Sequence, residues 1–358
     1  MKQLRIGGMF PLEHPSSQRT DFLQGYGADT RYYMSGRCAL YACLLDIASS
    51  ENLATDSPRI AYVPAYTCET VLASYQKAGY ALRFYEISTT ELTPVFRKAD
   101  LQGVSVLNLC AYYGFSRYDE AFLQECKRRG ITIIQDTTHS LFSQDGHSAY
   151  ADYYAGSVRK WMGIACGGVA IKREGTFSNG SLASDPDHLQ GRYRAMQYRA
   201  KALASDDPHF DEKASEVFWE TELRLRQMFD AFGSDAASID ILTHFDPAPL
   251  VARRRENYQT VLRHYKRSSQ CQAVFETLDD SACPSHFTMY SEDRERAQKT
   301  LEELGIRTTT YWPLPPMLPQ PQLYPQASWI YNHVFSIQID QRYTAMDMEY
   351  LGKALARL

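Results

Sequence analysis

Residue patterns that mark several common functional classes are missing from this sequence. It has no run of about 18 apolar residues, so we expect no transmembrane helix. The first ten residues also lack the long apolar stretch of a secretory signal. None of the eight cysteines is spaced as Cys-x-x-Cys, and none of the nine histidines pairs as His-x-x-x-His. We therefore expect free thiols in a reducing cytoplasm and no bound metal.

Charge and glycine patterns exclude further classes. The formal net charge of −4 favours neither a nucleic acid nor an anionic membrane as partner. There is no Walker phosphate loop, no Gly-x-Gly-x-x-Gly fingerprint and no internal repeat. With 358 residues, of which 44% are hydrophobic, the chain has the composition of a globular protein with a sizeable core.

Apolar strands and helices alternate in the first half of the chain. Short strands are expected at 60–64, 81–87, 104–110 and 131–135, and helices at 35–45, 67–79 and 118–129. Continuously apolar strands joined by helices are typical of a parallel sheet that is covered on both faces. Such sheets bind ligands at the carboxyl ends of their strands, where Asp136, His139 and Tyr112-Tyr113 fall in this sequence.

The same pattern suggests a division of the chain. We expect an N-terminal arm over residues 1–30, lying over the protein or a neighbouring subunit, a large domain over 31–245 and a small domain over 246–358. Helices expected at 189–204 and 212–232 are polar, and the charge run Arg192-Tyr193-Arg194 is interpreted as a solvated face. A helix from Arg253 is expected to make interdomain or subunit contacts, and residues 312–325 are expected to form a proline-rich loop.

Lys160 is the most informative residue in the sequence. It follows a strand-like segment and Ser157, and Gly167-Gly168 then begin a second apolar run. A lysine held between two strands loses water, which lowers its pKa and makes its amine a nucleophile; the alternative is an ordinary surface lysine on a turn. Upstream, the strand 131–135 ends on Asp136. A strand-end acid and a buried lysine are the two protein groups that a pyridoxal phosphate site needs.

Four features together carry a family resemblance: the Ser35-Gly36 helix start, Asp136-x-x-His139, Ser157-x-x-Lys160 and Gly167-Gly168. The sequence resembles the DegT/DnrJ/StrS nucleotide-sugar aminotransferases, which are fold-type-I enzymes that use pyridoxal 5'-phosphate. The resemblance implies an α/β fold. Its large domain has a mostly parallel seven-stranded sheet between helices, and a smaller C-terminal α/β domain follows. It also implies a homodimer.

The resemblance assigns roles to individual residues. Lys160 would hold the cofactor as a Schiff base and move the proton, Asp136 would pair with the pyridine nitrogen, and His139 would contact the phenolic oxygen or pack beside the ring. A buried core histidine is the alternative for His139. The further cofactor-binding residues would be Gly36, Arg37, Cys38 and Ser157, and the substrate-binding residues Tyr113, Tyr311 and Asn332.

Three departures from the family pattern are visible. Arg37-Cys38 stand where the family has Thr-Ala, so we expect the residues around the cofactor's phosphate to differ from those of the family. The aromatic residue that stacks on the cofactor in the family maps near Cys68, so the stacking residue is either absent here or supplied from elsewhere, with Tyr66 and Tyr113 as the candidates. The Gly-x-Asn-x-Arg motif that a partner subunit contributes is not recognisable between residues 173 and 246.

The expected activity is transfer of an amino group from glutamate or glutamine to a keto substrate, with a nucleotide-linked keto sugar implied by the family. Two alternatives stay open from the sequence. One is another pyridoxal phosphate reaction on the same fold, such as that of a lyase. The other is a non-catalytic relative of the aminotransferases.

Overall fold

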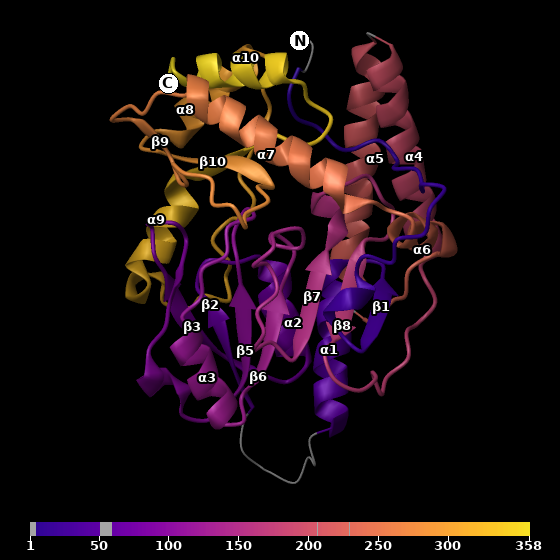
Figure 1. The fold of residues 1–358 in the computed structure, drawn as a ribbon, viewed down its shortest axis with the longest axis vertical. Coiled ribbons are helices and arrows are strands. Elements are labelled where there is room, and N and C mark those ends of the chain that lie inside the picture. Colours follow the sequence, from indigo (N-terminus) through magenta and orange to yellow (C-terminus); the bar gives the residue numbers. More distant parts are fainter. Residues whose placement is uncertain (1–4, 51–58, 206, 229) are drawn as a thin grey trace.

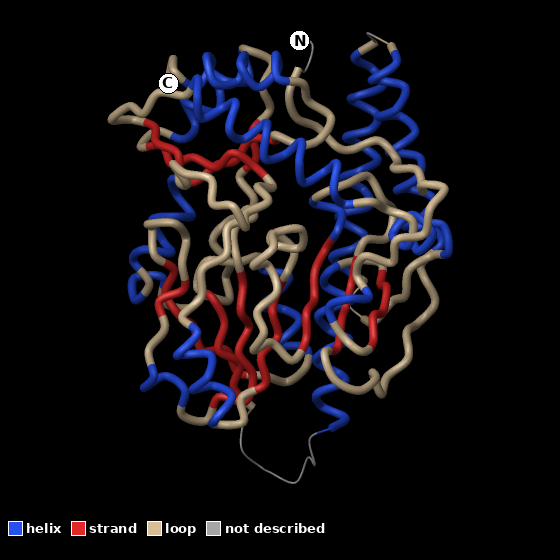
Figure 2. Tube along the Cα trace, viewed as in Figure 1, coloured by secondary structure: helices blue, strands red, loops and turns tan. Residues whose placement is uncertain are grey.

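Two β-sheets of different size organise the chain. The computed structural model describes residues 5–50, 59–205, 207–228 and 230–358. It has an eight-stranded sheet and a four-stranded sheet, which lie apart and are both accompanied by helices (Figures 1 and 2).

The large sheet has the strand order β1-β8-β7-β6-β5-β2-β3-β4. Strands β3, β2, β5, β6 and β7 run parallel, whereas β8, β1 and β4 pair antiparallel to their neighbours. The predicted mostly parallel sheet is confirmed, with eight strands rather than seven; the two-residue β4 is too short to leave a sequence pattern. The strands are β1 (Asp29–Tyr33), β2 (Ile60–Pro64), β3 (Ala81–Ile87), β4 (Pro94–Val95), β5 (Val104–Cys110), β6 (Thr132–Asp136), β7 (Tyr153–Ser157) and β8 (Gly168–Lys172).

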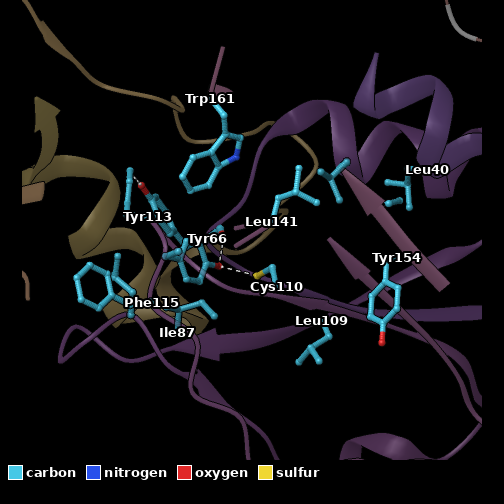
Figure 3. Close-up of a cluster of buried hydrophobic side chains, with 14 of the residues drawn as sticks. Leu40, Tyr66, Ile87, Leu109, Cys110, Tyr113, Phe115, Leu141, Tyr154 and Trp161 are labelled. Atoms are coloured by element: carbon cyan, nitrogen blue, oxygen red, sulfur yellow. Dashed lines mark hydrogen bonds between the residues drawn. The ribbon is translucent and has the colours of Figure 1, made fainter. Parts of the chain in front are cut away.

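The helices that connect the strands pack against this sheet. Helix α1 (Gly36–Ser50) lies on β7 and β8, α2 (Glu69–Lys77) lies on α1 and β3, and α3 (Glu120–Arg128) lies on β6. The strand interiors are buried because both sheet faces are covered, as the continuous apolar runs indicated. Figure 3 shows part of this core, where Cys110 of β5 lies near Tyr66.

The second sheet is antiparallel and is formed by the C-terminal part of the chain. Its order is β11-β12-β10-β9, and its strands are β9 (Cys271–Ala273), β10 (His286–Ser291), β11 (Thr308–Thr309) and β12 (Val334–Gln338). The accompanying helices are α7 (Pro247–His264), α8 (Arg294–Glu303), α9 (Pro325–His333) and α10 (Ala345–Leu355). Helix α9 was not predicted: Pro325, assigned to the proline-rich loop, occupies a first-turn position, where proline favours a helix. The division into domains stays a prediction.

Helices α4 (Pro186–Ala204) and α5 (Pro208–Gln227) form a hairpin that projects beside the large sheet, followed by α6 (Ala236–Thr243) (Figure 1). An Asp-Pro pair starts both α4 and α5, and the Asp185 and Asp207 carboxylates cap them by accepting backbone N–H groups. The interpretation of Arg192 as part of a solvated face is wrong. Its side chain is buried between the two helices, where its ion pair with the Glu222 carboxylate of α5 offsets the cost of burying a charge.

The described part of the N-terminal arm packs on its own chain. Ile6 forms a parallel bridge with Ile306, the Glu13 N–H donates to the Gly163 carbonyl at 2.7 Å, and the Thr20 N–H donates to the Thr243 carbonyl at 2.8 Å. The arm therefore connects the C-terminal segment, the Lys160 segment and the end of α6.

Arg254 of α7 makes a second connection between distant segments. Its buried guanidinium donates to the Ser285 carbonyl at 2.8 Å and to the Trp161 carbonyl at 3.0 Å. A charged donor that satisfies two buried carbonyl groups fixes both segments in position. The residue that follows Lys160 is thereby tied to the start of β10.

The eight cysteines are free, and seven of them are buried. Among the described helices, none is long and apolar enough to cross a membrane. The described residues also contain no group of three or more His, Cys, Asp or Glu side chains placed to hold a metal ion.

We predict that His147 makes the protein less stable in acid. The ring stacks on Tyr26 of the arm at 3.7 Å, neither ring nitrogen has a hydrogen-bond partner among the described residues, and burial lowers the His147 pKa to about 4. An unfolded histidine binds a proton near pH 6.5, so stability present above that pH is lost as the pH falls toward 4, by at most about 1.4 kcal/mol per pH unit. The variant His147→Phe keeps an aromatic ring stacked on Tyr26 and removes the imidazole that binds a proton. Urea unfolding at pH 7, 6 and 5 should show a smaller decline for the variant than for the wild type, and equal declines would contradict the prediction.

Candidate active site

A cavity of about 170 Å³ lies at the carboxyl ends of the parallel strands. Strands β5, β6 and β7 contribute their last residues, and the first turns of α1 and α2 lie beside them. Part of α5 and Trp312 complete the wall. The residues that line it are Ser35, Gly36, Arg37, Leu40, Thr67, Cys68, Thr70, Val71, Cys110, Ala111, Tyr112, Asp136, Thr138, His139, Ala155, Ser157, Arg159, Lys160, Glu222, Leu225 and Trp312. The predicted ligand edge of the sheet and this cavity coincide.

Lys160 ends a short helical turn, η3 (Val158–Lys160), that follows β7. The turn is folded back onto the sheet because the Val158 N–H donates to the Gly167 carbonyl at 2.7 Å. The Lys160 Nζ lies 4.7 Å from the centre of the Tyr311 ring. Burial lowers the pKa of Lys160, the Glu222 carboxylate opposes that shift, and Arg159 adds to it. The amine is therefore neutral at a lower pH than that of an exposed lysine.

Asp136 is the last residue of β6 and faces the same cavity. Its Oδ1 accepts the Thr138 N–H at 2.8 Å, and it forms no ion pair with any described residue. Burial raises the pKa of this carboxyl group, while the contacts to Thr138 oppose the shift. A buried carboxylate without a cationic partner is costly, so the cavity favours a positively charged N–H group beside Asp136.

His139 is held between the lysine segment and the C-terminal part of the chain. Its ring stacks on Trp312 at 5.5 Å, and its Nδ1 accepts the Tyr113 N–H at 3.4 Å. Burial, together with Lys160, lowers the pKa of His139 to about 3, so the ring is neutral. With Nδ1 accepting, the proton resides on Nε2, which is buried and has no partner among the described residues. This orphaned donor can serve an oxygen atom in the cavity.

The first turn of α1 forms the opposite end of the cavity. Gly36 allows a close approach, since a Cβ there would lie 3.0 Å from the Ser157 Cβ. Gly36, Arg37 and Ser157 line the cavity, whereas Cys38 packs behind it with its backbone N–H on the Ser35 Oγ at 3.3 Å. The Arg37 guanidinium donates to the Leu225 and Arg226 carbonyl groups of α5, both at 3.1 Å. Helix α5 is thereby fastened over the start of α1.

The three predicted substrate residues lie in different places. Tyr113 is buried behind the cavity, with its hydroxyl 3.2 Å from that of Tyr66. Tyr311 lies under the Lys160 amine, and its hydroxyl is 2.8 Å from the His286 Nε2. Asn332 is exposed near the end of α9 and does not line the cavity.

The aromatic residues in the cavity wall are not those expected to stack on a ligand. Tyr66 and Tyr113 belong to the buried cluster of Figure 3 and do not line the cavity, whereas Tyr112 and Trp312 do. Trp312 comes from a loop that only the folded chain brings to the strand ends.

Sequence reasoning missed two charged residues of the site. Arg159 could have been found from the sequence, because it directly precedes the candidate Lys160. Glu222 lies 62 positions after Lys160, inside a helix that reads as solvent-facing, and no local pattern distinguishes it. Its Oε1 accepts the Arg159 Nη2 at 2.7 Å.

Comparison with known proteins gives the fold but no sequence relative. No protein-family model matches the chain, and no curated protein sequence does. Among solved structures, the PLP-form of the putative sugar aminotransferase Spr1654 from Streptococcus pneumoniae is 15% identical with a TM-score of 0.66, covering 98% of both chains. PseC of Helicobacter pylori, an aminotransferase of pseudoaminic acid biosynthesis, is 13% identical with a TM-score of 0.67, also covering 98% of both chains.

A third structure carries the family name itself. It is a DegT DnrJ EryC1 StrS aminotransferase from Brucella abortus, 12% identical with a TM-score of 0.62, and the match covers 97% of this chain and 90% of that one. The chain has the fold of these aminotransferases. The predicted resemblance is thus confirmed for the aminotransferase fold, over nearly the whole chain.

We predict that Gly168 is required for the start of α1 to reach the strand ends. A Cβ at this position would lie 2.1 Å from the Ser35 carbonyl oxygen. Gly168→Ala should lower the free energy of unfolding by about 1–3 kcal/mol, because backbone must move to relieve the overlap. Gly180→Ala is the matched control, since nothing lies within 4 Å of its Cβ position. Equal stabilities of the two variants in urea unfolding would contradict this expectation.

Proposed function

We propose that the protein is an aminotransferase that uses pyridoxal 5'-phosphate. The observation that carries the proposal is that three polar groups of complementary chemistry face one cavity. These are the Lys160 amine with its lowered pKa, the Asp136 carboxylate without a cationic partner and the orphaned Nε2–H of His139. They match, in order, an aldehyde carbon, a protonated ring nitrogen and a phenolic oxygen.

The residues present fit this cofactor. Lys160, Asp136 and His139 would hold its ring, and Gly36, Arg37 and Ser157 would hold its phosphate at the start of α1, where backbone N–H groups favour an anion. Cys38 supports this turn from behind. When bound, the cofactor supplies a protonated pyridine ring that accepts electrons from a substrate carbon that loses a proton.

The chain's own groups have distinct tasks in this reaction. Lys160 would take and return the proton at Nζ, because burial lowers the pKa of its amine and so favours the neutral form that accepts a proton. Asp136 would hold a positive N–H group of the bound cofactor, since it forms no ion pair with any described cation. His139, neutral and fixed by Trp312 and Tyr113, donates from Nε2 and excludes water from that side.

The finer assignments rest on the resemblance. The amino donor would be glutamate or glutamine and the acceptor a keto sugar on a nucleotide; several structures of this fold are named sugar aminotransferases. Tyr113, Tyr311 and Asn332 remain the proposed substrate residues. We also propose that the protein is cytoplasmic, in keeping with the eight free cysteines. The homodimer is proposed from the family resemblance alone.

We expect the protein to become yellow when pyridoxal phosphate is added, with a visible absorption band that disappears on addition of glutamate. Lys160→Ala should abolish the band, because no other amine lines the cavity within the described residues. Lys353→Ala is the control, since that side chain is 66% exposed. No band in the wild type would exclude the proposed function, and a band that no amino acid changes would favour a non-catalytic relative.

We expect Asp136→Asn to bind the cofactor and to respond to glutamate at least about 100-fold more slowly, because the ring loses the charge that stabilises its protonated form. Stopped-flow absorbance measures this rate. An unchanged rate would remove Asp136 from the site.

A further inference from the structure

A cluster of buried charges lies beside Lys160, on the side of the cavity formed by α5. The Glu222 carboxylate accepts the Arg159 Nη2 at 2.7 Å and also accepts the Arg192 Nη2. Arg159 and Glu222 line the cavity, and Arg192 reaches the same carboxylate from α4 with a side chain only 4% exposed. Three separate elements, η3, α4 and α5, thus meet at one carboxylate.

The charges of this cluster do not balance. Two guanidinium groups share one carboxylate, and neither arginine pairs with another acid among the described residues. One carboxylate cannot neutralise two guanidinium groups, so at least one positive charge in this largely buried cluster has no opposite charge. A charged Lys160 amine would add to this excess. Buried charge of this kind is costly unless an anion completes the site.

Hydrogen bonding points in the same direction. The Arg159 Nη1 and the Arg192 Nε are buried and have no acceptor among the described atoms. His188 of α4 does not supply one, since both of its ring nitrogens are likewise buried without a hydrogen-bond partner among the described residues. The Arg192 guanidinium lies over the Phe218 ring at 4.6 Å, which keeps it in a fixed orientation. Fixed guanidinium groups with spare donors are suited to carboxylate and phosphate oxygens.

The pKa directions agree with an excess of positive charge. Burial alone would raise the pKa of Glu222, but Arg159, Arg192 and Lys160 together hold it well below its usual range. Burial and Arg159 lower the pKa of Arg192 to about 9 despite its pairing with Glu222. Glu222 therefore stays ionised and acts as the fixed anchor of both arginines.

We infer that Arg159, which lines the cavity, and Arg192, which shares its Glu222 anchor from behind the cavity wall, form an oxyanion subsite for a phosphate or carboxylate group of a small ligand in this cavity. The subsite deepens the proposed function and rests on it only for the identity of that ligand, which would be the cofactor through its phosphate or the amino donor through its carboxylate. Arg159, Arg192 and Glu222 all come from one chain.

The first experiment uses inorganic phosphate alone. We expect phosphate to raise the thermal unfolding midpoint of the cofactor-free protein more than chloride does at equal ionic strength. Arg192→Met should weaken phosphate binding about 10- to 100-fold, because the subsite loses one of its two guanidinium charges and Glu222 then neutralises Arg159 alone. Arg194→Met is the matched control, because Arg194 lies on the same helix, is 52% exposed and faces Glu220 at 3.9 Å.

A second variant guards against misfolding of the first. Arg192→Lys keeps the positive charge and removes the forked donors, and we expect phosphate binding between that of the wild type and that of Arg192→Met. Equal phosphate affinity in the wild type, Arg192→Lys and Arg194→Met would overturn the subsite. This result is independent of any yellow band, so the subsite and the proposed function can fail separately.

Two further titrations distinguish the ligands. If the cofactor's phosphate is the occupant, Arg192→Lys weakens binding of pyridoxal phosphate and leaves that of pyridoxal unchanged. If the donor's carboxylate is the occupant, cofactor binding is unchanged, and the half-saturating concentration rises for glutamate but not for its α-amide. No difference from Arg194→Met in either titration would overturn the assignment to this cavity.

Discussion

Burial of the Lys160 amine is the constraint on which the rest of the site depends. The amine lies over the Tyr311 ring and near the Glu222 cluster. Tyr311 belongs to the C-terminal part of the chain and Glu222 to the α4–α5 hairpin, so two distant segments are needed to exclude water from one nitrogen. Arg254 supports this arrangement by binding the Trp161 carbonyl directly after the lysine.

Groups of opposite charge meet at the cavity. Asp136 at the end of β6 offers negative charge without a cationic partner among the described residues, whereas Arg159 of η3 and Arg192 of α4 outnumber Glu222. A ligand with a positive ring and a negative substituent complements both sets of charges. This complementarity is a property of the chain's own residues, and it explains why charged side chains are kept in a place where burial is costly.

Local patterns predicted much of the large sheet. The expected strands 60–64, 81–87 and 104–110 have the same bounds as β2, β3 and β5, because a strand covered on both faces is predominantly apolar even where single polar residues such as Arg83 and Asn108 interrupt it. Asp136, His139 and Lys160 could be found because they follow such strands. Short or irregular elements were missed: β4 has two residues, and α9 begins at a proline within a segment that reads as a loop.

What the sequence by itself determined is the order of strands and helices and the residues at the strand ends, because those features follow from local periodicity. Only the tertiary structure decided what surrounds Lys160. Glu222 and Arg192 lie on helices whose polar sequence predicts exposure, and Trp312 lies on a proline-rich loop. Their burial depends on packing between segments far apart in the chain, and no local spacing records which segments meet.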